Sequence, residues 1–156
     1  MWYTIPYSIF PCGANPSFPG GHVAKRPALR LDLLNGSKRL SCFAIIDSGA
    51  DHCTFPLSFA TQLGLDTLAM KGSSVAGLGG VSNTLYWPVR LEFPGTTLEL
   101  DVYAGFSASM DAIGAGFGLL GQCGFFDRVN VSFHHRDGVF AVEVDDPPAP
   151  AVITNP

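Results

Sequence analysis

The sequence predicts a single all-β domain, and three observations point to it. Apolar residues make up 47% of the 156-residue chain and charged residues only 14%, which favours a packed core over a disordered chain. The 18 glycines and 12 prolines disfavour long helices and are typical of many short strands joined by tight turns. At this length the chain has room for one domain, but not for an enzyme built of two lobes.

The N-terminal residues 1–24 are expected to form an extended arm rather than a packed element. They are rich in proline, glycine and aromatic side chains. The domain itself is expected at residues 25–144. The proline-rich tail, residues 145–156, is expected to be loosely held unless a partner chain orders it.

The first half of the domain is expected to begin with a β-hairpin. Residues 29–33 alternate with period two, residues 40–46 form a second apolar strand, and Asn35-Gly36 between them is a strong turn signal. Residues 56–65 are predicted to form a short helix, because their apolar side chains recur at spacings of four. A glycine-rich stretch at residues 72–82 follows.

The second half is expected to hold four strands, at residues 85–93, 97–103, 129–133 and 139–144. Turn signals separate the members of each pair, Pro94-Gly95 in the first and Asp137-Gly138 in the second. Between the two pairs, Leu119-Leu120-Gly121 leads into a predicted short helix at residues 122–127.

Charge and cysteine content exclude several classes of function. The net charge is −4 with only nine Lys and Arg, so nothing indicates binding to nucleic acid or to an anionic membrane. The four cysteines, Cys12, Cys42, Cys53 and Cys123, form no local pair of the kind that holds zinc. We therefore expect a cytoplasmic protein that needs no metal or other cofactor.

The segment Ile45-Ile46-Asp47-Ser48-Gly49-Ala50-Asp51 is the one that points to chemistry. An apolar strand runs into an acid, and a buried unpaired carboxylate costs on the order of several kcal/mol unless it has a partner or a function. Gly49 lets the backbone turn sharply, and Ser48 can tie the turn to a neighbouring backbone group. A β-turn capped by an aspartate is the structural alternative for this segment alone.

Two further segments follow residues 45–51 along the chain and favour a functional interpretation of Asp47. Residues 75–82 form a glycine-rich tip that lacks both the GxGxxG pattern and the Gly-Lys-Ser/Thr of phosphate-binding loops. A hairpin that closes over a ligand explains this tip better, because glycines give a hinge-capable backbone. The second apolar loop, Leu119-Leu120-Gly121, places Gly121 74 residues after Asp47.

In this order, the motifs resemble those of the retropepsins, the single-domain aspartic proteases of retroviruses, and of the bacterial and eukaryotic domains similar to them. The similar region runs from about residue 25 to residue 140 and contains Arg26-Pro27, Asp47-Ser48-Gly49-Ala50-Asp51, Gly77-Leu78-Gly79-Gly80 and Leu119-Leu120-Gly121. The resemblance implies a closed retropepsin-like β-barrel with one short C-terminal helix and a glycine-rich flap hairpin.

The resemblance also implies a homodimer. Each subunit in this family supplies one D-[ST]-G, and the chain contains a single copy, at Asp47. Two chains would then place two aspartates face to face, sharing a proton and activating a water between them. The implied reaction is hydrolysis of peptide bonds in an extended peptide or protein substrate, with no cofactor.

The resemblance assigns roles to the neighbours of Asp47. Ser48 is expected to hold the partner's loop, and Gly49 to offer its carbonyl to the substrate. Asp51 is expected to contact the substrate main chain and to anchor the dimer, together with Arg26. The other implied substrate-binding residues are Ala50, Gly77, Leu78, Gly79 and Gly80, with Trp87 either lining the cleft or lying in the core.

Gln122 departs from the family pattern. The viral enzymes commonly carry an arginine at this position that pairs with the acid corresponding to Asp51, and glutamine cannot form that bidentate ion pair. One alternative function is therefore a non-catalytic retropepsin-fold module for dimerisation or peptide binding. A weaker one is a cysteine enzyme that uses Cys53. The N-terminal arm has two candidate roles, crossing to a partner subunit or covering the cleft as an inhibitory segment.

Overall fold

The computed structural model describes residues 1–77 and 80–144, and this part of the chain is built mostly of strands. Its only helices are α1 (Leu57–Gln62), α2 (Ala108–Ala112) and the 3₁₀ turn η1 (His135–Asp137). The prediction of a mostly β domain is confirmed. The expected tail, residues 145–156, lies outside the described residues.

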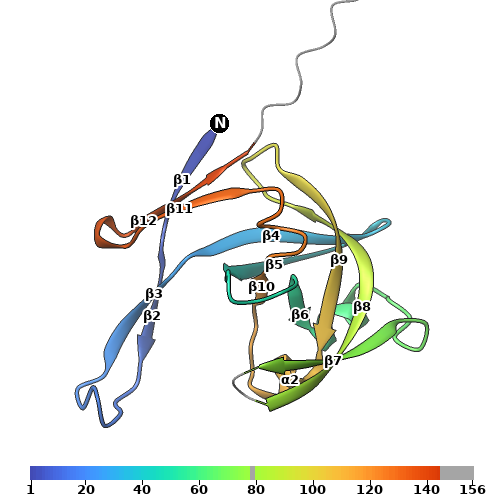
Figure 1. The fold of residues 1–156 in the computed structure, drawn as a ribbon, viewed down its shortest axis with the longest axis horizontal. Helices are drawn as coiled ribbons and strands as arrows, with labels where there is room; N and C mark the ends of the chain where they lie inside the picture. The colour runs from blue at the N-terminus through green and yellow to red at the C-terminus, as the bar shows by residue number, and fades with distance from the viewer. Residues whose placement is uncertain (78–79, 145–156) are drawn as a thin grey trace, which may run out of the picture.

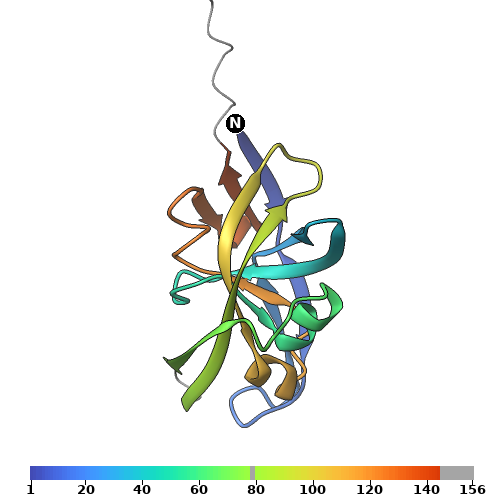
Figure 2. The same cartoon turned by 90° about the vertical axis from the view of Figure 1, so that its right-hand side faces the viewer.

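Seven strands form the main sheet in the order β4-β5-β10-β6-β9-β8-β7. They are β4 (Ala28–Asn35), β5 (Lys38–Ile46), β6 (Thr54–Pro56), β7 (Lys71–Gly77), β8 (Gly80–Glu92), β9 (Glu99–Ser107) and β10 (Gly118–Leu120). β8 also pairs with β4, through residues 90–92 and 32–34. The sheet therefore curls strongly, as the long strands β8 and β9 show in Figures 1 and 2.

A second sheet has the order β1-β12-β11, and a separate hairpin joins β2 to β3. The strands are β1 (Trp2–Pro6), β2 (Ser8–Cys12), β3 (His22–Arg26), β11 (Asn130–His134) and β12 (Val139–Glu143). β1 pairs with β12 along its full length, from Trp2 opposite Glu143 to Pro6 opposite Val139. Figure 1 shows the β2–β3 hairpin extending away from both sheets.

One hydrophobic core joins the two larger sheets. β4 buries five of its eight residues, and three of them, Leu29, Leu31 and Leu33, belong to this core. Phe55, Phe106 and Leu120 of the main sheet belong to the same buried cluster as Phe140 of β12. The three-stranded sheet therefore packs against the main sheet.

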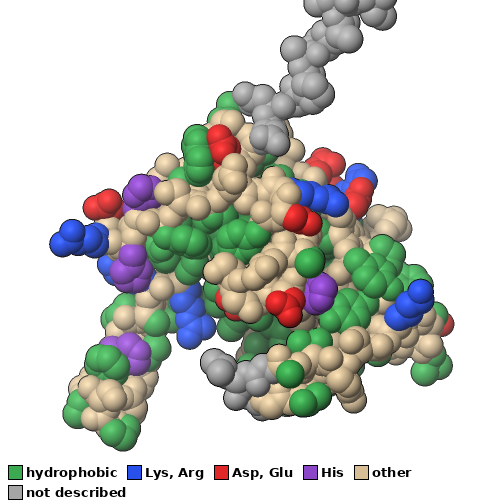
Figure 3. Space-filling model, viewed as in Figure 1, with side chains coloured by type: hydrophobic (Ala, Val, Ile, Leu, Met, Phe, Trp, Pro, Cys, Tyr) green, Lys and Arg blue, Asp and Glu red, His purple; other side chains and the backbone are tan. Residues whose placement is uncertain are grey.

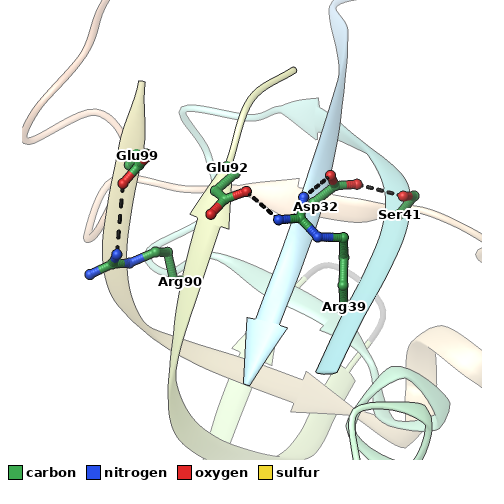
Figure 4. Close-up of polar contacts among 6 residues, drawn as sticks. All are labelled: Asp32, Arg39, Ser41, Arg90, Glu92 and Glu99. Atoms are coloured by element: carbon green, nitrogen blue, oxygen red, sulfur yellow. Dashed lines mark hydrogen bonds and ion pairs between the residues drawn. The ribbon is translucent and has the colours of Figure 1, made fainter. Parts of the chain in front are cut away.

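A buried acid, Asp32, fastens β4 to its neighbours on the outer face of the main sheet (Figure 4). Its carboxylate accepts hydrogen bonds from the Ser41 hydroxyl and the Arg39 guanidinium, both at 2.5 Å. Arg39 also donates to Glu92 of β8 at 2.8 Å. The Ser41 hydrogen bond, helped by Arg39, holds the pKa of Asp32 below its ordinary value although burial opposes the shift.

Most of the predicted elements are confirmed. The hairpin around Asn35-Gly36 is formed by β4 and β5, and Gly36 adopts a φ of +57° in its turn. The helix predicted within residues 56–65 is α1. The four strands predicted in the second half correspond to β8, β9, β11 and β12.

The short C-terminal helix predicted at residues 122–127 is wrong. The segment is a run of turns, in which the N–H groups of Phe126 and Asp127 donate to carbonyls five residues earlier, at 3.3 and 3.1 Å. Gly124 has a φ of +100°, which interrupts a helical path, and its N–H donates to the Asp127 carboxylate at 3.1 Å. α2 was not anticipated, because its five residues bury only Met110 and so carry no period.

The N-terminal segment is more structured than the sequence suggests. β1 belongs to the three-stranded sheet, and Tyr7 is part of the hydrophobic core, with 9% of its surface exposed. The domain start expected at residue 25 falls inside β3. Only the part between β1 and β4, residues 8–26, projects from the body (Figure 1).

Candidate active site

Asp47 lies directly after β5, where backbone hydrogen bonds join the end of this strand to its neighbours on both sides. β4 pairs with β5 in the antiparallel sense, and β10 pairs with it in the parallel sense, with Leu120 opposite Ile46. The N–H of Asp47 donates to the Leu120 carbonyl at 3.0 Å, and the N–H of Ile46 donates to the Pro27 carbonyl at 2.9 Å. The end of the strand is therefore held from both sides, and Asp47 is half-buried there.

A tight turn at residues 47–50 orients the Asp47 carboxylate. The N–H of Gly49 donates to Asp47 Oδ1 at 2.9 Å, and the N–H of Ala50 donates to the Asp47 carbonyl at 3.1 Å. Ser48 and Gly49 are exposed at the tip of this turn. The expected contacts of Ser48 with a partner and of Gly49 with a substrate remain predictions.

The segment after β10 packs against the Asp47 turn. Gln122 donates twice, from its backbone N–H to the Ala50 carbonyl and from Nε2 to the Ser48 carbonyl, each at 2.8 Å. A Cβ atom on Gly121 would lie 2.4 Å from the carbonyl oxygen of His52. Only glycine therefore allows this approach, which explains why the apolar loop ends in Gly121.

The sequence predicts that Gln122 can form a hydrogen bond but no bidentate ion pair, and it does not predict the partner of that hydrogen bond. Its side chain contacts the backbone of the Asp47 turn in its own chain. No local sequence pattern indicates this contact, because the contact depends on the parallel pairing of β10 with β5. That pairing places residues 121–122 beside residues 48–50.

The glycine-rich hairpin expected over the site is formed by β7 and β8, which pair from Lys71 opposite Tyr86 to Gly77 opposite Gly80. Leu78 and Gly79 lie outside the described residues. Near the far end of the hairpin, where Ser82 pairs with Val75, the hydroxyl of Ser82 contacts those of Ser107 and Ser109 at 2.9 and 3.0 Å. These contacts connect the hairpin to β9 and α2. Trp87, further along β8, is half-buried against the core.

Arg26 and Asp51, the two residues expected to form dimer contacts, lie in different surroundings. The Arg26 guanidinium stacks over the Phe10 ring, 5.2 Å from its centroid. Asp51 is exposed, and its carbonyl accepts the Cys123 N–H at 2.8 Å. Their roles in substrate binding and dimerisation remain predictions.

The thiol of Cys53 is poorly suited to nucleophilic chemistry. The residue is fully buried, and burial raises the pKa of its thiol to about 11. Such a thiol is protonated at neutral pH, whereas the thiolate is the reactive form. The structure therefore disfavours the cysteine-enzyme alternative.

The hollows on the surface of the described residues include two shallow ones of about 620 and 490 Å³. Neither is lined by residues 47–50, although His52 and Cys123 border the smaller one. Across residues 1–77 and 80–144, no group of three or more His, Cys, Asp or Glu side chains is arranged to hold a metal ion. Within the same ranges, no helix has the length and apolar character needed to cross a membrane.

Comparisons with known proteins support the fold. The chain is similar to the crystal structure of a retropepsin-like aspartic protease from Rickettsia conorii, with a TM-score of 0.53 and 12% sequence identity. The similarity covers 86% of this chain and 98% of that chain. At this identity the likeness establishes a retropepsin-like fold and nothing finer. No protein-family model matches the chain, and no curated protein matches its sequence.

Proposed function

We propose that the chain is a retropepsin-like aspartic endopeptidase that works as a homodimer, with one Asp47 from each subunit. The braced turn after β5 is the observation that carries this proposal. It holds a half-buried carboxylate at the end of a core strand through Gly49 and is itself supported by Gln122. Catalytic groups need this kind of rigid support to act at a fixed position.

The reaction follows from two carboxylates that face each other. Like charges about 3 Å apart do not both ionise readily, so the pair of Asp47 side chains shares one proton. The ionised carboxylate takes a proton from a bound water as the water oxygen attacks the scissile carbonyl carbon. The protonated carboxyl donates its proton to the carbonyl oxygen, which gives a tetrahedral gem-diol. The C–N bond then breaks as the amine nitrogen takes the proton that the first carboxylate removed from the water, and a gem-diol hydroxyl returns a proton to the second carboxylate.

The substrate cleft in this proposal lies between two subunits. Neither of the two hollows described above is lined by residues 47–50, and the proposal places the substrate where a second chain completes the cleft. The β7–β8 hairpin covers an extended peptide, and Gly77, Leu78, Gly79 and Gly80 are the residues of this segment that contact it. Ala50 and Asp51 contact the peptide from below, and apolar side chains flank the scissile bond.

Replacement of Asp47 by asparagine tests the proposal. Asparagine keeps an Oδ1 atom that can accept the Gly49 N–H, so the turn is expected to persist while the acid–base function is lost. We expect cleavage of a mixed peptide library to fall by about 10²–10⁴-fold. Asp137→Asn, the same change at an exposed position of η1, is the matched control and is expected to leave cleavage unchanged.

Two outcomes would contradict the proposal. An Asp47→Asn protein that cleaves as fast as the unaltered protein would exclude Asp47 from the chemistry. An unaltered protein that dimerises, but neither cleaves peptides nor binds a pepstatin-type transition-state mimic, would favour the non-catalytic peptide-binding or dimerisation module.

A further inference from the structure

Residues 8–26, which we call the N-terminal hairpin, lack a packing partner within the chain. They comprise β2, β3 and the connection between them, and Figure 3 shows them as a limb that stands away from the body. Among the described residues, those forming the hydrophobic core and those packed against it include none from this segment. A lone two-stranded hairpin is marginally stable in water, so contacts with a second molecule would stabilise this one.

One face of the N-terminal hairpin, which holds Ile9, Pro11 and Val23, is the more exposed of the two. Ile9 and Val23 lie on one face with 67% and 59% of their surfaces exposed. Phe10 lies opposite Ala24 on the other face, and Phe18 near the tip is 49% exposed. Large apolar side chains left in water at this density indicate a surface that is covered in the working protein.

The charge of the N-terminal hairpin is opposite to that of the remaining chain. Residues 8–26 contain Lys25 and Arg26 and no acidic residue. The other residues hold seven Lys and Arg against thirteen Asp and Glu. A second copy of this chain therefore offers a body of complementary charge.

The base of the N-terminal hairpin is tied to the candidate active site. β3 runs through Pro27 into β4, and the Pro27 carbonyl accepts the N–H of Ile46, the residue before Asp47. In Figure 1 the hairpin extends from the side of the body on which β5 ends. A second subunit whose Asp47 faces this one would lie on the same side.

We propose that the N-terminal hairpin reaches across the dimer and packs on the body of the second copy. Each subunit then contacts the body of the other through its own hairpin. This inference rests on the proposed function, because the site with one Asp47 is incomplete without a second chain. The apolar face with Ile9 and Val23 supplies the buried contact, and Lys25 supplies electrostatic attraction to the acidic body. The N-terminal hairpin then sets the affinity of one subunit for the other without contacting the reacting atoms.

Sedimentation of an Ile9→Glu/Val23→Glu variant tests this role. The two side chains are exposed within the chain, so the fold of the subunit is expected to persist, as circular dichroism will show. We expect the dissociation constant of the dimer to rise about tenfold or more. Leu68→Glu/Ile113→Glu is the matched control, since these side chains are 95% and 80% exposed elsewhere on the molecule, and it is expected to dimerise normally.

A photo-crosslinking amino acid at position 9 gives a second readout that does not depend on stability. Irradiation is expected to yield a covalent dimer from position 9 and none from the control position 113. Crosslinks confined to the same chain would contradict the proposal and would indicate an arm that folds back over its own cleft.

The two proposals fail in different ways. A dimer that survives the Ile9→Glu/Val23→Glu change and yields no crosslink from position 9 overturns the role of the hairpin and leaves the protease intact. A dimer that depends on the hairpin but cleaves no peptide supports the hairpin and overturns the protease. A chain that stays monomeric at every concentration overturns both.

Discussion

Gln122 connects the segment after β10 to the Asp47 turn through its own backbone and side chain. Its Nε2 donates to the Ser48 carbonyl at 2.8 Å, at the position where the viral enzymes commonly carry an arginine. A neutral amide gives a weaker hydrogen bond than a guanidinium paired with a carboxylate. It nevertheless braces the Asp47 turn without relying on a charge.

Asp47 could be proposed as a candidate from the sequence, whereas the contact of Gln122 with the Asp47 turn could not, and the difference is physical. The acid, the hydroxyl residue and the glycine are consecutive, so their turn chemistry is local. Gln122 lies 74 residues after Ser48 in the chain. Its contact depends on the pairing of β5 with β10, which no local pattern specifies.

Asp32 provides a prediction on pH. Its pKa in the folded chain is held below the ordinary value of 3.8, by Ser41 first and then by Arg39. The carboxylate therefore stabilises the fold at neutral pH, and that contribution is lost as the pH falls below about 4 and through the folded-state pKa. We expect Asp32→Asn to lower the free energy of unfolding at pH 7 by about 1–3 kcal/mol.

Urea denaturation at a series of pH values checks this prediction. The difference between the unaltered protein and Asp32→Asn should shrink toward acidic pH, because the unaltered carboxylate becomes protonated there. The control Asp137→Asn should show no comparable loss at pH 7. A difference that stays constant from pH 7 to pH 3 would contradict the assigned ion pair and its cause.

At the scale of elements, the close contact between the end of β10 and the Asp47 turn positions the candidate site. Gly121 lies against the carbonyls of Ala50 and His52, where a Cβ would sit at 2.6 and 2.4 Å. Backbone atoms cannot move aside as a flexible side chain can. The two loops therefore keep their spacing only while residue 121 is glycine.

Gly121→Ala is expected to separate these loops. The free energy of unfolding should fall by about 1–3 kcal/mol, and peptide cleavage should fall with it because the Asp47 turn loses its support. Gly116→Ala is the matched control, since a Cβ there meets no atom within 4 Å, and its effect should stay within about 0.5 kcal/mol. Thermal unfolding of both variants, followed by peptide assays, checks this prediction. Equal stability of Gly121→Ala and Gly116→Ala would show that the two loops do not touch as described.

The elements that the sequence predicted well are those with a short-range pattern. β4 and β5 alternate or run apolar around a clear turn, and α1 repeats its apolar residues at helical spacing. The helix predicted at residues 122–127 failed because a positive φ at Gly124 and wide turns took its place. β1 was not predicted because its partner, β12, lies about 140 residues away along the chain, a pairing set by tertiary packing rather than by local pattern.

At the scale of the whole molecule, the single D-[ST]-G motif of this sequence leads to the requirement for a second chain in the proposed mechanism. One subunit provides one braced aspartate, and the proposed chemistry needs two. The low charge of the surface and the apolar N-terminal hairpin are both explained if two chains bury these surfaces together. Activity then belongs to the assembly, so it should depend on chain concentration in the range of the dimer dissociation constant.

The most direct test of a shared active site is to mix the unaltered chain with Asp47→Asn at fixed total concentration and let the subunits exchange. If one Asp47 from each subunit is required, mixed dimers are inactive, and activity follows the square of the unaltered fraction. An equal mixture should then retain about one quarter of the activity. Retention of about one half, with activity proportional to the unaltered fraction, would mean that each chain works alone and would contradict the shared site.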